Sequence, residues 1–173
     1  MSARPEKILV RGVNWLGDAV MTTPALQRLR EAKPHARIEL LTHEKFADLW
    51  RGHPSIDGII TFTAGQPVLA VARALRSWTF DAAVLFPNSM RSALEVFFAR
   101  IPTRIGYGRN LRSIFLTRAF PPRVGAVKMH KRSASEVSRR IARGAIRDTF
   151  PPAAHHMHDY LHLVRGLGAN PSA

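Results

Sequence analysis

Short apolar runs alternate along most of the chain with segments that suit helices. The first run, Lys7-Ile-Leu-Val-Arg-Gly12, predicts a buried strand followed by a turn. Similar runs predict strands at residues 37–42, 58–62, 81–86 and 104–107, and the segments between them predict helices at residues 19–32, 46–50, 68–78 and 90–99. This alternation of strand and helix indicates an α/β fold with a parallel sheet flanked by helices.

Two strand-to-helix loops are expected to lie together at one edge of this sheet. Right-handed crossovers bring such loops to the carboxyl ends of the strands, where open α/β sheets bind ligands. The loops are residues 12–18 and 87–91. The first reads Gly12-Val-Asn-Trp-Leu-Gly17-Asp18 and lacks the Gly-x-Gly-x-x-Gly spacing of a dinucleotide-binding turn, which disfavours a nicotinamide cofactor.

The alternating pattern ends after Phe120. Two Pro-Pro pairs bound a basic segment at residues 121–152, for which we expect irregular structure with an exposed helix over residues 133–146. The apolar face of that helix is modest, which favours a solvated helix over a membrane anchor. A last helix is expected over residues 155–167, ending at Gly168, and the 173 residues are expected to form one domain.

Composition narrows the class of protein. Hydrophobic residues make up 46% of the chain and charged residues 22%, as in a folded soluble domain. No apolar run approaches the roughly 20 residues that a membrane-spanning helix needs, and the first residues are too short and polar for a signal peptide, so we expect a cytoplasmic protein. The absence of cysteine excludes disulfides and thiolate metal sites.

The net charge of +14 predicts an anionic partner: nucleic acid, an anionic membrane surface or a phosphorylated substrate. Most of the excess lies between Arg100 and Arg147, where Glu136 is the one acidic residue. A basic module that binds nucleic acid or membrane without catalysis is therefore one hypothesis. Aromatic residues that could stack on bases do not alternate with these arginines, which disfavours nucleic acid.

Several polar residues near the loops can have either a structural or a functional role. Asp18 can cap the first helix or serve as a general base, and Asn14 can form a turn or contact a ligand. Ser89 can cap the helix that follows it. The cluster His155, His156, His158 and His162 suggests a metal site, but the sequence offers no matching third ligand, so no metal is expected.

Three motifs, in order, resemble the lipopolysaccharide heptosyltransferase family, especially the branch that adds the second heptose. Residues 8–26, Ile-Leu-Val-Arg-Gly-Val-Asn-Trp-Leu-Gly-Asp-Ala-Val-Met-Thr-Thr-Pro-Ala-Leu, resemble its opening motif. Leu85-Phe-Pro-Asn-Ser-Met-Arg-Ser-Ala-Leu94 resembles the motif after the fourth strand, and Arg100-Ile-Pro-Thr-Arg-Ile-Gly-Tyr107 the strand after that. The resemblance covers roughly residues 7–120, and residues 156–168 resemble the last helix of the family's N-terminal domain.

The resemblance implies the N-terminal half of a GT-B-type glycosyltransferase. In this family two Rossmann-like domains face each other across a cleft, and the N-terminal one receives the acceptor. The C-terminal domain, which mainly holds the donor substrate ADP-heptose, has no counterpart in these 173 residues. The chain alone is therefore expected to be nearly inactive, and no cofactor is expected.

By the same resemblance, Asp18 matches the catalytic carboxylate, which takes the proton of the acceptor hydroxyl as that oxygen attacks the anomeric carbon with inversion. One carboxylate suffices because a diphosphate leaves without an acid's proton, so no metal is required. The acceptor is Kdo-bearing lipid A or its heptosyl form. Because it is anionic and presented at the membrane, the basic half is expected to steer it, with peripheral association at the inner membrane and no nucleic acid.

The acceptor-binding residues are expected on the two loops and in the basic half. Gly17 would allow close approach to the backbone, and arginine forks would pair with carboxylates or phosphates. Taken singly, Arg104, Arg109 and Arg112 are each better explained as solvated surface charges. The expected acceptor contacts are Asn14, Trp15, Gly17, Asn88, Ser89, Arg91, Arg104, Arg109 and Arg112.

Overall fold

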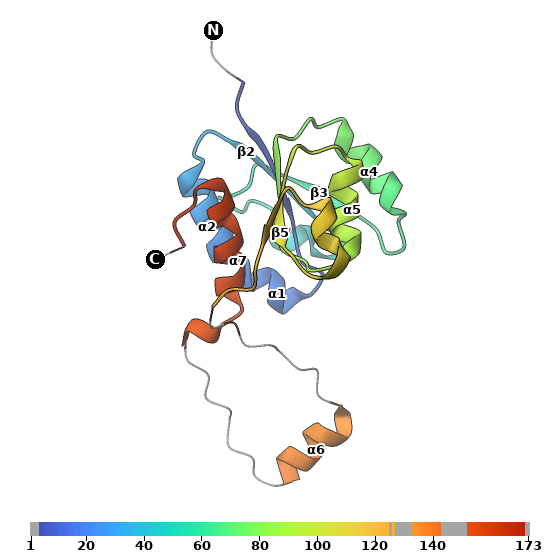
Figure 1. Ribbon diagram of the computed structural model, residues 1–173, viewed down its shortest axis with the longest axis vertical. Coiled ribbons are helices and arrows are strands. Elements are labelled where there is room, and N and C mark those ends of the chain that lie inside the picture. Colours follow the sequence, from blue (N-terminus) through green and yellow to red (C-terminus); the bar gives the residue numbers. More distant parts are fainter. Residues whose placement is uncertain (1–3, 125, 127–132, 143–151, 172–173) are drawn as a thin grey trace.

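The computed structural model describes residues 4–124, 126, 133–142 and 152–171. Its centre is a parallel sheet of six strands in the order β3-β2-β1-β4-β5-β6 (Figure 1). The strands are β1 (Lys7–Arg11), β2 (Arg37–His43), β3 (Gly58–Phe62), β4 (Ala82–Leu85), β5 (Thr103–Tyr107) and β6 (Arg118–Phe120). Five of these were predicted, and β6 was missed because this short edge strand is largely exposed and has no apolar run.

The predicted helices are present with one difference at the first. They are α1 (Leu16–Met21), α2 (Thr23–Ala32), η1 (Glu44–Phe46), α3 (Ala47–Trp50), α4 (Val68–Arg76) and α5 (Met90–Phe98). The single helix predicted at residues 19–32 is two helices that meet at Thr22. The Thr22 hydroxyl donates to the Ala19 carbonyl at 2.6 Å, and Pro24, which has no N–H, falls in the first turn of α2.

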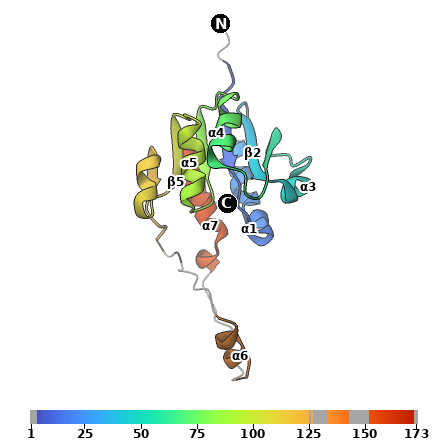
Figure 2. The same ribbon diagram turned by 90° about the vertical axis from the view of Figure 1, so that its right-hand side faces the viewer.

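Helices cover both faces of the sheet, as Figures 1 and 2 show. Alternate residues of β1 explain this: Ile8 and Val10 pack into the core beneath α2 and α7 (Met157–Val164), whereas Leu9 packs into the core beneath α4 and α5. Both faces of the strand are therefore apolar, as in a sheet covered on both sides.

The order of the strands reverses between β1 and β4. These neighbours are paired with Val10 opposite Val84 and Arg11 opposite Leu85, so the two strands end at the same level. The chain leaves β1 toward α1 and leaves β4 toward α5, on opposite faces of the sheet. Such a switch point is where open α/β sheets leave room for a ligand.

The helices after β5 are η2 (Asn110–Phe115), α6 (Ala134–Ala142), η3 (Pro152–Ala154), α7 and η4 (Arg165–Leu167). The predicted last helix is confirmed, and it ends at Gly168, whose φ of +90° suits glycine. Of the basic helix expected at residues 133–146, α6 is the described part and residues 143–146 lie outside the described residues, as does much of the segment 121–152. Within the described ranges, no helix is long and apolar enough to cross a membrane.

Candidate functional site

A pocket of about 230 Å³ lies at the switch point between β1 and β4. Its walls come from the β1–α1 loop, the β4–α5 loop and the start of α7. They comprise Val13, Asn14, Trp15, Asp18, Phe86, Pro87, Asn88, Ser89, His156 and Tyr160. Five residues singled out in the sequence, Asn14, Trp15, Asp18, Asn88 and Ser89, are thus brought together.

Asp18 lies in the first turn of α1 without capping it. The N-cap is Trp15, whose backbone is extended, and no side chain makes a cap hydrogen bond there, so the capping interpretation of Asp18 is wrong. The carboxylate still lies near the positive end of the helix dipole. Within the described part of the chain it has no side-chain hydrogen bond and no ion pair. This partly exposed carboxylate is therefore available to a ligand in the pocket.

Tyr160 is a pocket residue that the sequence analysis missed. It comes from α7, is 3% exposed, and packs its ring against Phe86 at 5.1 Å between centroids. Burial, followed by the nearby carboxylates of Asp18 and Asp159, raises the pKa of Tyr160 above its usual value. The phenol therefore stays neutral and can donate a hydrogen bond. Its position in the pocket depends on where α7 packs against the sheet, and the sequence pattern of the two loops does not predict that packing.

His156 also lines the pocket, in a role other than the metal ligand considered from the sequence. Its Nδ1 lies 3.0 Å from Oδ2 of Asp159, and Oδ1 of the same carboxylate accepts from Nε of Arg123 at 3.2 Å. His162 bonds through Nδ1 to the Tyr107 hydroxyl at 3.1 Å. Among the residues that the structure describes, no three His, Cys, Asp or Glu side chains form a metal-binding group.

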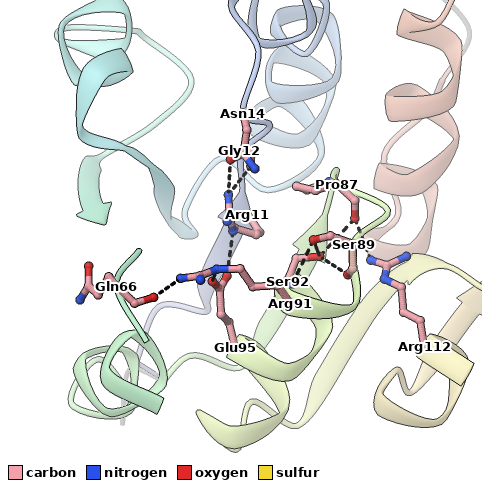
Figure 3. Close-up of polar contacts among 10 residues, drawn as sticks. All are labelled: Arg11, Gly12, Asn14, Gln66, Pro87, Ser89, Arg91, Ser92, Glu95 and Arg112. Carbon is pink, nitrogen blue, oxygen red and sulfur yellow. Dashed lines mark hydrogen bonds and ion pairs between the residues drawn. The ribbon is translucent and has the colours of Figure 1, made fainter. Parts of the chain in front are cut away.

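The second loop is fixed by hydrogen bonds of Ser89 and Ser92 (Figure 3). Ser89 is the N-cap of α5, and its Oγ accepts from the Ser92 N–H at 3.2 Å, which confirms the capping interpretation. The Ser92 hydroxyl donates to the Ser89 carbonyl at 2.8 Å. These bonds leave Asn88 exposed at the rim of the pocket.

A buried charge pair supports the first loop from below (Figure 3). Nε of Arg11 lies 2.9 Å from Oε2 of Glu95, and Nη1 of Arg11 donates to the Gly12 carbonyl at 2.7 Å and to Oδ1 of Asn14 at 3.3 Å. Burial lowers the pKa of Arg11, and the Glu95 carboxylate opposes that shift. The sequence analysis missed this pair, because Arg11 lies inside a predicted strand and Glu95 inside a predicted helix.

The structure does not bring the four predicted arginines into the pocket. Arg91 binds Glu95 and the Gln66 carbonyl, and Arg104 donates to the carbonyls of Phe115 at 2.7 Å and Ile101 at 2.6 Å. Both guanidinium groups are occupied by the protein itself, and for Arg104 this contradicts the interpretation as a solvated surface charge. As acceptor contacts, all four arginines stay predictions.

Arg112 is 2% exposed and donates to the carbonyls of Tyr107 and Pro87, the latter at 2.9 Å. Burial, with Arg109 nearby, lowers the pKa of Arg112 to about 10. Arg112 therefore links the end of β5 to Pro87 in the pocket wall. Arg109 lies exposed. Gly17 is on α1 beside the pocket, and a Cβ added there would meet nothing within 4 Å.

Comparison with known proteins shows which proteins the chain resembles. Residues 68–134 match the family model for glycosyltransferase family 9 (heptosyltransferase). Lipopolysaccharide heptosyltransferase 2 of Escherichia coli K12 is 32% identical over 112 residues, which are 61% of this chain and 32% of that protein. Lipooligosaccharide heptosyltransferase 2 of Haemophilus ducreyi is 32% identical over 107 residues, 58% of this chain and 30% of that protein. The resemblance to the heptosyltransferase family is confirmed.

Solved structures agree with the sequence relatives. E. coli ADP-heptose lps heptosyltransferase II has a TM-score of 0.58 at 31% identity, covering 64% of this chain and 33% of that one. A family 9 glycosyl transferase from Veillonella parvula shares the fold over 97% of this chain and 42% of its own, with a TM-score of 0.70 at 20% identity. The predicted fold class, a Rossmann-like parallel sheet flanked by helices, is confirmed. The chain spans about a third of the length of the curated heptosyltransferase relatives.

Proposed function

We propose that residues 1–173 form the acceptor-binding domain of an inverting heptosyltransferase, which moves heptose from ADP-heptose to the inner core of lipopolysaccharide. The observation that supports it most is the position of Asp18. In a chain related to heptosyltransferases, this carboxylate lines a pocket at the switch point of the sheet and has no protein partner among the described residues. A general base must reach the hydroxyl that it deprotonates, and a carboxylate without a protein partner can do so.

In the proposed reaction Asp18 accepts the proton of an acceptor hydroxyl while that oxygen bonds to the anomeric carbon of heptose. The bond from that carbon to the diphosphate breaks on the opposite face, so the configuration inverts and ADP leaves with the electron pair. A donor domain of the kind that the family resemblance implies would mainly hold the ADP-heptose. Asn14, Trp15, Asn88 and Ser89 would position the acceptor sugar, and the neutral Tyr160 hydroxyl can donate to one of its oxygens.

The acceptor proposed is Kdo-lipid A or its heptosyl form, met by peripheral association with the inner membrane on the cytoplasmic side. Trp15, which lines the pocket, is 75% exposed, and Leu16 and Val20 of α1 are exposed as well. Exposed tryptophan and apolar side chains suit the interface of a membrane. The net charge of +14 supports the same partner.

Calorimetric titration of this chain at moderate salt tests the domain assignment. We expect a Kdo-containing lipid A fragment to bind and ADP-heptose not to bind. If neither bound while short RNA or DNA did, the chain would be a basic nucleic-acid module and the proposal would fall. The salt dependence of any such binding would report the phosphate contacts.

Substitution of Asp18 tests the base. In a protein of the relatives' full length, Asp18→Asn should abolish transfer while acceptor affinity and the thermal midpoint stay close to wild type. Asn88→Ala is the matched control on the opposite wall, expected to weaken acceptor binding and retain turnover. Undiminished turnover in Asp18→Asn would exclude this residue as the base.

A further inference from the structure

The pocket contains one group that can become cationic. Among the described residues that line it, Asp18 is the acidic side chain and His156 the basic one. The arginines expected to bind an anionic acceptor lie elsewhere: Arg91 pairs with Glu95, and Arg112 donates to backbone carbonyls. An anionic sugar that enters the pocket meets the repulsion of Asp18, and His156 is placed to offset it.

His156 is held in one orientation by its neighbours. Nδ1 lies 3.0 Å from Oδ2 of the Asp159 carboxylate, a distance that suits an ion pair when the ring is protonated. A carboxylate beside Nδ1 favours a proton on that nitrogen, which leaves Nε2 for a ligand. The Asp159 carboxylate is itself held by Arg123, at 3.2 Å from Nε, with both side chains less than a fifth exposed. The imidazole also packs edge-on against Tyr160, with ring centroids 5.0 Å apart.

Tyr160 connects this group to the proposed base. Its ring contacts His156, and the charge of Asp18 contributes to the raised pKa of its hydroxyl. The three side chains therefore surround one volume of about 230 Å³. An oxyanion bound at His156 would hold a neighbouring hydroxyl of the same sugar beside Asp18.

We propose that His156 binds an oxyanion of the acceptor sugar, a carboxylate or a phosphate, through Nε2–H of its imidazolium form. Asp159 and Arg123 act as positioning residues that fix the ring. The inference rests on the proposed function for its ligand, but the orientation of the ring is independent of it. Charge-assisted hydrogen bonds to oxyanions are about twice as strong as neutral ones, so the loss of this contact should be measurable.

Nuclear magnetic resonance of the histidine side chains, in the 173-residue chain, tests the orientation first. The ¹⁵N pattern of neutral His156 should show the proton on Nδ1, and Asp159→Asn should move it toward Nε2, the commoner form in water. Finding the proton on Nε2 in the wild type would overturn the proposed geometry.

Binding is tested with three probes: free Kdo, inorganic phosphate and a Kdo-containing lipid A fragment. We expect His156→Gln to weaken binding of the lipid A fragment about ten- to hundredfold, and His158→Gln, on α7 outside the pocket lining, to leave this binding unchanged. If only free Kdo shifts the His156 signals, the bound oxyanion is a carboxylate. If only inorganic phosphate shifts them, the bound oxyanion is a phosphate.

The two proposals fail separately. Unchanged fragment affinity in His156→Gln overturns the oxyanion role and leaves the acceptor domain standing. If the fragment does not bind the wild type while phosphate or Kdo still binds in a His156-dependent way, the acceptor proposal falls and the oxyanion site stands. If none of the three probes shifts the His156 signals, the inference is overturned.

Discussion

The guanidinium of Arg11 and the carboxylate of Glu95 form an ion pair directly beneath the β1–α1 loop, with side chains 1% and 0% exposed. Glu95 also receives Arg91 at 2.8 Å, and Arg11 reaches Asn14 on the pocket wall (Figure 3). The geometry of the first loop is thus linked to α5 through buried charges. Removing one member of such a group leaves another charge in the interior without a partner.

Glu95→Leu should therefore destabilise the fold by about 3–5 kcal/mol, the cost typical of an orphaned buried charge. Urea unfolding followed by circular dichroism measures it. Glu31→Leu is the matched control, because the Arg28–Glu31 pair lies at the surface and should change stability by less than about 1 kcal/mol. Adding Arg11→Met to Glu95→Leu should recover part of the loss, since the orphaned cation is gone. Equal small effects of both single variants would contradict a structural role for the buried pair.

Gly17 offers a separate test of ligand approach to the α1 backbone. A Cβ at this position meets nothing within 4 Å, and α1 is helical there, so Gly17→Ala should raise stability by up to about 1 kcal/mol. If acceptor or donor approaches the backbone here, the same variant should lose affinity or turnover. Thermal unfolding and titration with the lipid A fragment measure the two effects. Unchanged ligand binding together with unchanged turnover would show that the glycine is not needed for ligand access.

The sheet was predictable because its strands are buried on both faces and therefore appear as continuous apolar runs, as in Lys7–Arg11. The two loops were predictable as pocket walls because parallel strands end at one edge. The break at Thr22 depends on a local hydroxyl contact that periodicity does not register. Edge strand β6 lacks the buried apolar residues that make a strand recognisable in a sequence.

The part of the site that comes from α7 was not predictable. His156 and Tyr160 reach the pocket because α7 packs beside α2, a tertiary contact between segments more than a hundred residues apart. The contacts of the arginines were not predictable for a different reason. The charge pattern predicts that they attract anions, but it does not tell which group each guanidinium contacts. Arg112 appeared to be a surface cation, and the packing of η2 buries it against backbone carbonyls.

Arg112 and Gly106 should act as one unit beneath the second loop. A Cβ at Gly106 would lie 2.9 Å from Nη2 of Arg112, the atom that donates to the Pro87 carbonyl. Gly106→Ala and Arg112→Gln should each cost about 1–3 kcal/mol, because a buried carbonyl loses its donor, and each should weaken acceptor binding. A double-mutant cycle measures the coupling, which should be clearly non-additive. Simple additivity would mean that the glycine is required for another reason.

Stability should fall as the pH drops below about 6.5, the ordinary pKa of histidine. Burial lowers the pKa of His53, and burial with Arg165 and Arg123 nearby lowers that of His162. In the folded protein these rings resist protonation, whereas in the unfolded chain they take up protons near pH 6.5. The unfolded state then binds more protons, so the stabilisation is complete above that pH and is lost as the pH falls toward the folded pKa values.

The thermal midpoint, compared between about pH 7.5 and about pH 5.5, measures this effect in a window above the titration of ordinary carboxylates. His53→Gln with His162→Gln should flatten the dependence, because the two groups that gain protons on unfolding are gone. His35→Gln, at an exposed position, should keep the wild-type slope. A slope that survives the double substitution would assign the pH dependence to groups other than these two partly buried histidines.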